Sequence, residues 1–244
     1  MGGPAAIAAQ QPTPETKAFQ PAITSTDSPP EALTPERLGD TRLIERRYQE
    51  AIEAYQDAPN SSSEVWNKRG IAYEMLFDLK DAARCFKQSL RLNPLDSRVL
   101  NNLATIYDSQ KDHRKAERLY RRALTLAPAS PLILLDLGTN LVLQEKYEQG
   151  REMYKRAVSI DPGVLDSMDA PIVLSPMSHH QTGAINYYKA KGFAQAGKRE
   201  EAVTYLRRAL HEGYASPSKI AQDSSFTQLH GVPKFDELLA EPGD

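Results

Sequence analysis

Apolar and small residues recur every 34 positions through the middle of the chain. Three prolines, Pro94, Pro128 and Pro162, mark the period. In each period a large residue stands at position 4, a small one at 8, Ala or Gly at 20 and an aromatic ring at 24. Offsets of three and four residues place positions 4, 8 and 11 on one face of a first helix, and positions 20, 24 and 27 on one face of a second. The units cover residues 63–96, 97–130 and 131–164.

Each unit is predicted to form a helical hairpin. Small residues at positions 8 and 20 let two helix axes approach closely, and the aromatic residue at position 24 fills the space beside them. Proline ends the second helix, because it cannot donate a backbone hydrogen bond. One hairpin leaves apolar surface on both sides, so neighbouring hairpins must stack. Position 8 holds Gly70, Ala104 and Gly138, position 20 holds Ala82, Ala116 and Gly150, and position 24 holds Phe86, Tyr120 and Tyr154.

This pattern resembles the tetratricopeptide repeat family, whose 34-residue unit carries a large residue, Leu-Gly, Tyr, Ala, an aromatic residue, Ala and Pro in this order. The resemblance implies an all-α fold: a right-handed superhelical solenoid of antiparallel helix hairpins. It further implies the bacterial type of repeat protein, which ends in a C-terminal capping segment. Arg69 is the clear departure, since Leu103 and Leu137 occupy the same position in the next two units.

The flanking segments are assigned from weaker signals. Residues 34–62 keep the internal spacing but lack a full second helix, so they are predicted to form a degenerate first repeat or one lead helix. Residues 165–182 are predicted to be an insertion loop, 183–216 a degenerate repeat and 217–244 a cap on the last hairpin. Residues 1–33 are rich in Pro, Ala, Thr and Gln and poor in large apolar side chains, so a disordered tail is expected there.

Composition narrows the function mainly by exclusion. The formal net charge is −2, from 30 basic and 32 acidic residues, so no nucleic-acid partner is expected. The single cysteine, Cys85, excludes an intrachain disulfide. No apolar stretch is long enough to span a membrane. Phosphate-binding glycine loops, nucleophile elbows and metal-binding helices are missing, so we predict no catalytic residue, no cofactor and no metal. The adjacent His179 and His180 point in different directions and favour a loop or a helix start over a metal site.

The sequence is compatible with more than one cellular compartment. Ala6-Ile7-Ala8 has the small-x-small form of a signal-peptidase site, but a basic start and an apolar core do not precede it. The protein is therefore expected to be cytoplasmic, or exported and periplasmic if residues 1–9 are the remnant of a signal peptide.

The resemblance implies a concave groove lined by positions 2, 5, 6, 9, 12 and 13 of the first helices. Family members that clamp the acidic tails of heat-shock chaperones use Lys, Asn and Arg there; only Asn102 fits here, so a chaperone-tail clamp is disfavoured. The candidate peptide-binding residues are Asn67, Ile71, Glu74, Arg98, Asn101, Asn102, Thr105, Asp108, Leu132, Leu135, Asp136, Thr139 and Val142.

Leu132, Leu135 and Val142 predict an apolar peptide or an amphipathic helix as guest, and Asn101 and Asn102 could hydrogen-bond an extended backbone. The alternative is that the insertion, the N-terminal tail or the next repeat covers the leucines. The predicted function is a non-catalytic protein-protein interaction scaffold that binds a peptide or helix in its groove.

A second interpretation places the function on the outer surface. Basic residues recur at positions 25 and 26 of the second helices, where they are either solvated charge or a positive ridge. On this interpretation the chain is a structural or accessory subunit of a complex, for example at a bacterial envelope, and uses its convex face or solenoid end. The ridge would contain Lys87, Arg121, Arg122, Lys155, Arg156, Arg207 and Arg208.

Overall fold

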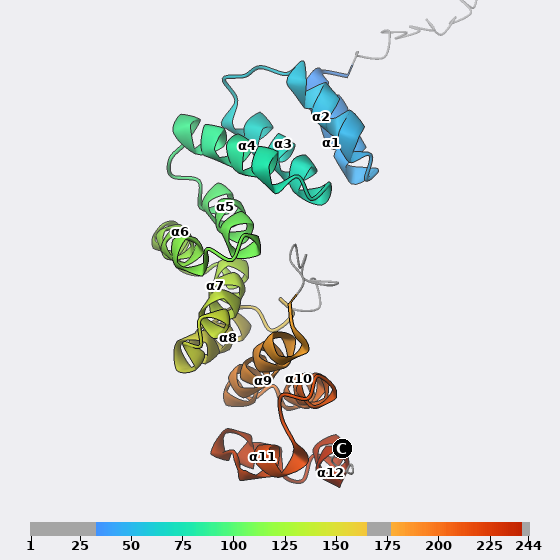
Figure 1. The fold of residues 1–244 in the computed structure, drawn as a ribbon, viewed down its shortest axis with the longest axis vertical. Coiled ribbons are helices and arrows are strands. Elements are labelled where there is room, and N and C mark those ends of the chain that lie inside the picture. The colour runs from blue at the N-terminus through green and yellow to red at the C-terminus, as the bar shows by residue number, and fades with distance from the viewer. Residues whose placement is uncertain (1–32, 165–176, 241–244) are drawn as a thin grey trace, which may run out of the picture. The chain divides into compact units, whose positions relative to one another are not determined.

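The computed structural model describes residues 33–164 and 177–240, and within these ranges every regular element is a helix (Figure 1). Residues 1–32 of the expected tail, most of the expected insertion and residues 241–244 lie outside the described residues. The elements are α1 (Pro35–Ile44), α2 (Tyr48–Gln56), α3 (Ser63–Met75), α4 (Leu79–Leu92), α5 (Ser97–Ser109), α6 (His113–Leu126), α7 (Pro131–Leu143), α8 (Tyr147–Ile160), α9 (His179–Gln195), α10 (Arg199–His211), α11 (Pro217–Gln222), the 3-10 helix η1 (Ser224–Leu229) and α12 (Pro233–Ala240).

The helix starts repeat with the period of the sequence. The first helices α3, α5 and α7 begin 34 residues apart, and so do the second helices α4, α6 and α8. Side-chain caps explain why several of them begin there. Ser62 and Ser130 accept hydrogen bonds from the third residue of α3 and α7, and Asp78 and Asp112 do the same for α4 and α6. The prediction of consecutive helix hairpins is confirmed.

Glycine at position 8 allows the two helices of a hairpin to touch. A Cβ atom added to Gly70 would lie 2.6 Å from the ring of Phe86, and one added to Gly138 would lie 2.7 Å from the ring of Tyr154. Each aromatic ring therefore rests on bare backbone of the first helix. The interpretation of the small residue at this position as a close helix approach is confirmed.

Gly150 and Val142 fit each other as a pair. A Cβ on Gly150 would lie 2.7 Å from Cγ2 of Val142 and 2.9 Å from the carbonyl oxygen of Gly138. In the preceding hairpin the same two repeat positions hold Ala116 and Asp108. Valine carries two γ-methyl groups on its β-carbon and aspartate a single γ-carbon, so Val142 is the bulkier neighbour of position 20.

We expect Gly150→Ala to lower the free energy of unfolding by about 1–2 kcal/mol, because overpacking outweighs the roughly 1 kcal/mol that alanine gains in helix propensity. Urea unfolding of Gly150→Ala, Val142→Ala and the double variant measures the effect. The double variant should lose about 1 kcal/mol less than the two single losses combined. Strictly additive losses would show that the two side chains do not interact.

Helices α1 and α2 form a hairpin instead of one long lead helix (Figure 1). The chain turns at Arg46, which has a positive φ of 60°. Gly39 and Tyr55 repeat the glycine–aromatic contact of the later hairpins, since a Cβ on Gly39 would lie 2.4 Å from the Tyr55 ring. Helix α2 has 9 residues, whereas α4, α6 and α8 have 14.

Helix α9 begins inside the segment expected to be an insertion loop. Ser178 and Gln181 form a capping box: the Ser178 hydroxyl accepts from the Gln181 backbone N–H at 3.2 Å, and the Gln181 side chain accepts from the Ser178 N–H at 3.1 Å. The expected loop end at residue 182 is therefore wrong. The strong cap starts the helix at His179, before the first residue of the expected repeat.

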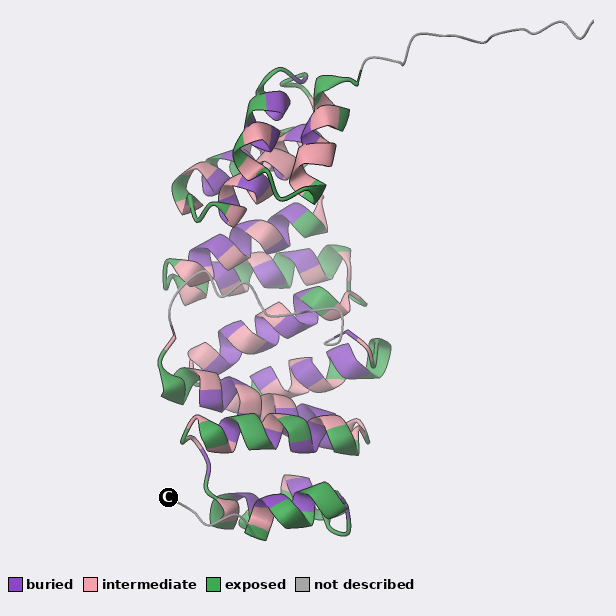
Figure 2. Ribbon diagram, turned by 90° about the vertical axis from the view of Figure 1, so that its right-hand side faces the viewer, coloured by how far each residue is buried: buried purple, intermediate pink, exposed green. Residues whose placement is uncertain are grey.

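The last segments, α11, η1 and α12, pack on α9 and α10. Their apolar side chains join Phe193 and Leu206 in one buried cluster, and Tyr187 of α9 donates a hydrogen bond to Asp223 at 2.5 Å. Figure 2 shows buried residues where helices meet and exposed residues on the outer turns. Among the described helices there is none with the length and apolarity that a bilayer-spanning segment requires. The buried cap residues are Ile220, Phe226, Leu229, Phe235 and Leu238.

Candidate protein-interaction surface

The candidate residues lie on three first helices that contact one another in sequence order, α3 with α5 and α5 with α7. We call the side of α3, α5 and α7 that carries them the first-helix face. At the start of two of these helices the side chains are open to solvent. Arg98 forms ion pairs with Glu64 at 3.0 Å and Asp96 at 3.1 Å, and Leu132 is 46% exposed.

The apolar part of the expected groove is covered. Leu135 and Val142 are only 2% and 3% exposed, and they pack in one cluster with Ala184 and Ile185 of α9. The expectation that both side chains face a guest is therefore wrong, because α8 of the same hairpin and α9 of the next one bury them. Leu132 remains the open apolar candidate on α7.

Two asparagines connect neighbouring first helices. Asn102 donates to Oδ1 of Asn67 at 3.1 Å, and Asn101 donates to Oδ2 of Asp136 at 2.8 Å. Asn101 is 4% exposed, and its own Oδ1 has no hydrogen-bond partner. Part of the hydrogen-bonding capacity that the sequence assigned to a guest is therefore used inside the protein, but an acceptor is left over.

The neighbouring polar and apolar candidates have local roles. The Thr105 hydroxyl donates to the carbonyl oxygen of Asn102 at 2.9 Å. Thr139 accepts a hydrogen bond from the Tyr154 hydroxyl at 3.0 Å. Ile71 is half-buried against the core between the first two full hairpins.

The carboxylates of this face differ in how well they are paired. Asp108 accepts from Asn140 at 2.6 Å and lies 2.8 Å from Nδ1 of His113. Asp136 accepts from Asn101. Glu74 is 8% exposed and has neither a hydrogen bond nor an ion pair within the described residues. One buried carboxylate on α3 therefore lacks a partner.

Burial and mutual repulsion shift these groups toward their neutral forms. Burial, reinforced by the charge of Asp136, raises the pKa of Glu74 to about 7. Burial raises the pKa of Asp136 to about 6, although the Asn101 hydrogen bond opposes it. Burial lowers the pKa of Lys189 on α9 to about 8, against the attraction of Asp136. The sequence argument missed Lys189, because it occupies the repeat position where leucine is expected.

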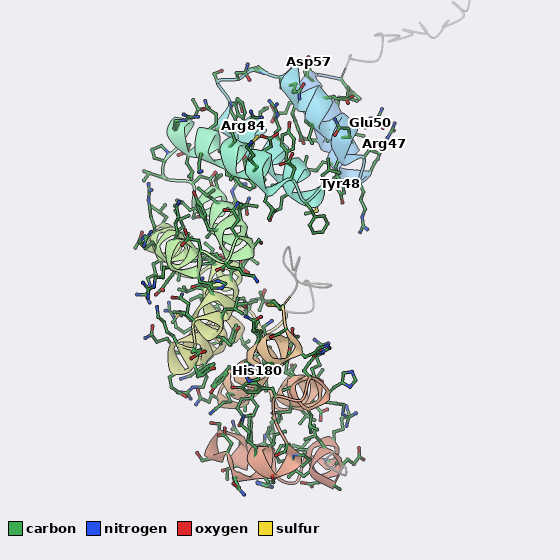
Figure 3. The ribbon with its side chains drawn as sticks, viewed as in Figure 1. Arg47, Tyr48, Glu50, Asp57, Arg84 and His180 are labelled. Atoms are coloured by element: carbon green, nitrogen blue, oxygen red, sulfur yellow. The ribbon has the colours of Figure 1, made fainter. Side chains whose placement is uncertain are left out.

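A second charged surface lies on the second helices. Lys80, Arg84, Lys87 and Arg91 stand at helical offsets of three and four on α4 and line a shallow cavity, and Figure 3 labels Arg84 there. Together with Lys115 of α6 they form what we call the outer basic face. Of these five, Arg84 alone has a carboxylate partner within the described residues, Asp81 at 3.1 Å.

Tyr107 joins the two helices of the outer basic face. The ammonium groups of Lys115 and Lys87 lie 4.0 Å and 5.6 Å from the centroid of its ring. Burial raises the pKa of the Tyr107 phenol, but hydrogen bonds and charge from the two lysines outweigh it and hold the pKa below the usual 10. This cluster concentrates positive charge where an anionic group could bind.

His179, His180 and Cys85, the residues whose chemistry suggested a metal site or a reactive thiol, have surroundings typical of structural residues. Nδ1 of His179 lies 2.7 Å from Glu212, and His180 lies with its ring against Tyr214 at a centroid distance of 5.0 Å. Cys85 is fully buried, which raises the pKa of its thiol to about 11. The part of the chain that the structure describes contains no group of three or more His, Cys, Asp or Glu side chains that could hold a metal ion.

Several solved structures share this fold at low sequence identity. PilF of Pseudomonas aeruginosa matches with a TM-score of 0.55 and 16% identity, over 84% of this chain and 86% of PilF. MamA of Desulfovibrio magneticus RS-1 matches with a TM-score of 0.53 and 17% identity, over 78% of this chain and 96% of MamA. YrrB matches with a TM-score of 0.50 and 16% identity, over 73% of this chain and 84% of YrrB.

The sequence comparison is consistent with this fold. A search of curated proteins finds no match to the chain. Residues 68–131 match the family model described as tetratricopeptide repeat. This segment begins within α3 and ends at the first residue of α7, so it spans the hairpins that show the 34-residue period most clearly. Residues 68–131 therefore carry tetratricopeptide repeats, and the described residues as a whole form an all-α array of stacked helix hairpins with the fold of tetratricopeptide repeat proteins.

Proposed function

We propose that this chain is a non-catalytic scaffold that binds a segment of a partner protein along the first-helix face. The carrying observation is one carboxylate on this face: Glu74 is 8% exposed and forms neither a hydrogen bond nor an ion pair within the described residues. Buried polar groups are normally paired, so an unpaired carboxylate on this face favours a ligand. The structural similarity to YrrB also supports the proposal, because YrrB is described as a tetratricopeptide repeat protein with an unusual peptide-binding site.

The burial of Leu135 and Val142 changes the expected guest. An amphipathic helix would need a continuous apolar wall, and α8 and α9 already bury these two side chains. An extended segment needs hydrogen-bonding groups instead, which Asn102 and Thr105 supply on α5. Leu132 adds one exposed apolar contact at the start of α7. We therefore infer an extended, mainly polar protein segment as the guest.

The outer basic face favours a second candidate function. Four basic side chains of α4 and Lys115 of α6 carry five positive charges, and one acidic side chain is paired with them. A surface of this kind attracts an acidic partner and orients its approach. In this candidate the chain is an accessory subunit that docks an acidic protein through its second helices.

One affinity-purification experiment separates the two candidates. Tagged wild type is compared with Asn102→Ala/Leu132→Ala on the first-helix face and with Lys87→Glu/Lys115→Glu on the outer basic face. We expect the first variant to recover at least about ten-fold less of the partners bound by wild type, as expected for the loss of about 1.4 kcal/mol in binding, and the second to recover normal amounts. The charge reversal Arg156→Glu on α8 is the matched control. The opposite pattern would establish the outer basic face as the binding surface.

A further inference from the structure

The helices α4 and α6 carry basic side chains at the same three repeat positions, 18, 22 and 25, whereas α8 has glutamate at positions 18 and 22. Helix α4 has four basic residues and one acidic residue, α6 has five and one, and α8 has three and two. The glutamates of α8 form ion pairs within their own helix, with Arg151 at 2.5 Å and with Lys155 at 3.7 Å. The repeat thus supplies a matched comparison, in which α8 compensates its positive charge and α4 and α6 accumulate it. The three positions hold Lys80, Arg84 and Lys87 in α4, Arg114, Arg118 and Arg121 in α6, and Glu148, Glu152 and Lys155 in α8.

The basic side chains of α4 form a row along one side of the helix. Successive members are separated by four, three and four residues, and all of them are exposed to solvent. The two ends of the row, Lys80 and Arg91, stand 11 residues apart, which corresponds to about 16 Å along the helix axis. A single anionic group is much shorter than this row, so an elongated anion with several charges fits it better. The row consists of Lys80, Arg84, Lys87 and Arg91, which line the shallow cavity together with Leu90.

Helix α6 brings a further cation next to this row. The ammonium groups of Lys115 and Lys87 lie 4.0 Å and 5.6 Å from the centroid of the same ring, that of Tyr107. Tyr107 itself is only 7% exposed, so a ligand would contact the two ammonium groups, and the tyrosine would position them. Two ammonium groups gathered at one ring repel each other, and a bound anion would relieve this repulsion.

We propose that the outer basic face binds a soluble ligand that carries two or more phosphate groups. A phosphate group has up to about two negative charges at pH 7 and three acceptor oxygens, so one group can bridge cations on adjacent turns of α4. The forked guanidinium groups of Arg84 and Arg91 suit bidentate bonds to phosphate, and the lysines act as point charges. The carboxylates of an acidic protein carry one charge each and would neutralise the row less completely. The inference goes beyond the proposed function, because these side chains lie outside the first-helix face.

Isothermal titration calorimetry of the full chain with inorganic tripolyphosphate tests the inference. We expect Lys87→Ala/Arg91→Ala to bind tripolyphosphate at least about ten-fold more weakly than wild type. Lys155→Ala/Arg156→Ala is the matched control, because it removes the same two positive charges from α8, and its affinity should stay within about two-fold. None of these four side chains is buried, so both variants should keep the circular dichroism of wild type. Inorganic orthophosphate should bind wild type at least about ten-fold more weakly than tripolyphosphate, because it has fewer charges and reaches less of the row.

Three other results would overturn the phosphate site. Equal losses in the α4 and α8 variants would show that only the overall charge attracts the anion. Tighter binding of a glutamate-rich synthetic peptide of equal charge would replace the phosphate ligand by the acidic protein of the second candidate function. Retention on vesicles that contain phosphatidic acid, without binding of tripolyphosphate, would point to a lipid surface. The proposed function is tested separately by Asn102→Ala/Leu132→Ala, which should bind tripolyphosphate as wild type does.

Discussion

Replacing Tyr154 by alanine is expected to lower the free energy of unfolding by about 3–5 kcal/mol, the range for removal of a large buried aromatic side chain. Tyr154 is fully buried in α8 and contacts two other helices, α7 and α9. Its ring lies against the backbone of Gly138 on α7, and its Cβ lies 2.9 Å from the position of a Cβ on Gly192 of α9. Removing the ring would leave a cavity at the junction between the third full hairpin (α7 and α8) and the fourth (α9 and α10).

Tyr154→Phe is the matched control for this prediction. It keeps the ring and removes only the hydrogen bond to Thr139, so we expect a loss of about 1 kcal/mol. Urea unfolding followed by circular dichroism and by tyrosine fluorescence measures both variants. The two signals should coincide for wild type if the hairpins unfold together. Equal losses for the two variants would mean that the ring does not hold α7, α8 and α9 together.

Raising the pH from 5 to 8 is expected to weaken the fold through Glu74 by about 2–3 kcal/mol. The pKa of this side chain is raised from 4.5 to about 7 in the folded chain. Between these values the folded protein keeps a proton that the unfolded chain has released. Stability is therefore greatest below pH 4.5 for this group and is lost as the pH rises toward 7. Above 7 both states are ionised and the effect is constant.

Glu74→Gln tests this prediction, because the amide resembles the protonated acid and does not titrate. The variant should match wild type near pH 5 and exceed it in stability at pH 8. Asp136 contributes a change of the same sign at lower pH, since its pKa is raised to about 6, so the variant should keep a smaller decline below pH 6. Parallel pH profiles for the two proteins would show that Glu74 is ionised throughout.

The helices and their contacts within a hairpin could be predicted from the sequence, because they depend on residues that recur. Gly70 with Phe86 and Gly138 with Tyr154 are each separated by 16 residues, and both contacts are present. The face between hairpins was less accessible to prediction. Leu135 is covered by α9, whose start follows a break in the period, so its burial could not be read from the repeat alone.

The turns inside the hairpins show a different limit of sequence reasoning. Phe77, Lys111 and Glu145 have φ values of 59–63° at the same repeat position, and Gly197 takes this place in the last full hairpin. A left-handed backbone favours glycine, so three side chains are held there against local preference by the helices on either side. Similarly, Asp108 has hydrogen-bonding partners and Glu74 has none within the described residues, although both stand at position 12 of the repeat. The difference depends on which residues lie opposite each carboxylate, and the position in the repeat does not reveal it.

The C-terminal segments also determine where further hairpins can be added to the repeat array. Ile220, Phe226 and Phe235 occupy the apolar side of α9 and α10 on which a further hairpin would stack. Within the described residues, these segments therefore occupy the place on α9 and α10 where the first hairpin of a second copy would pack in a head-to-tail polymer. Lengthening the array by protein engineering would require inserting new repeats ahead of α11, so that the terminal helices still seal the final one.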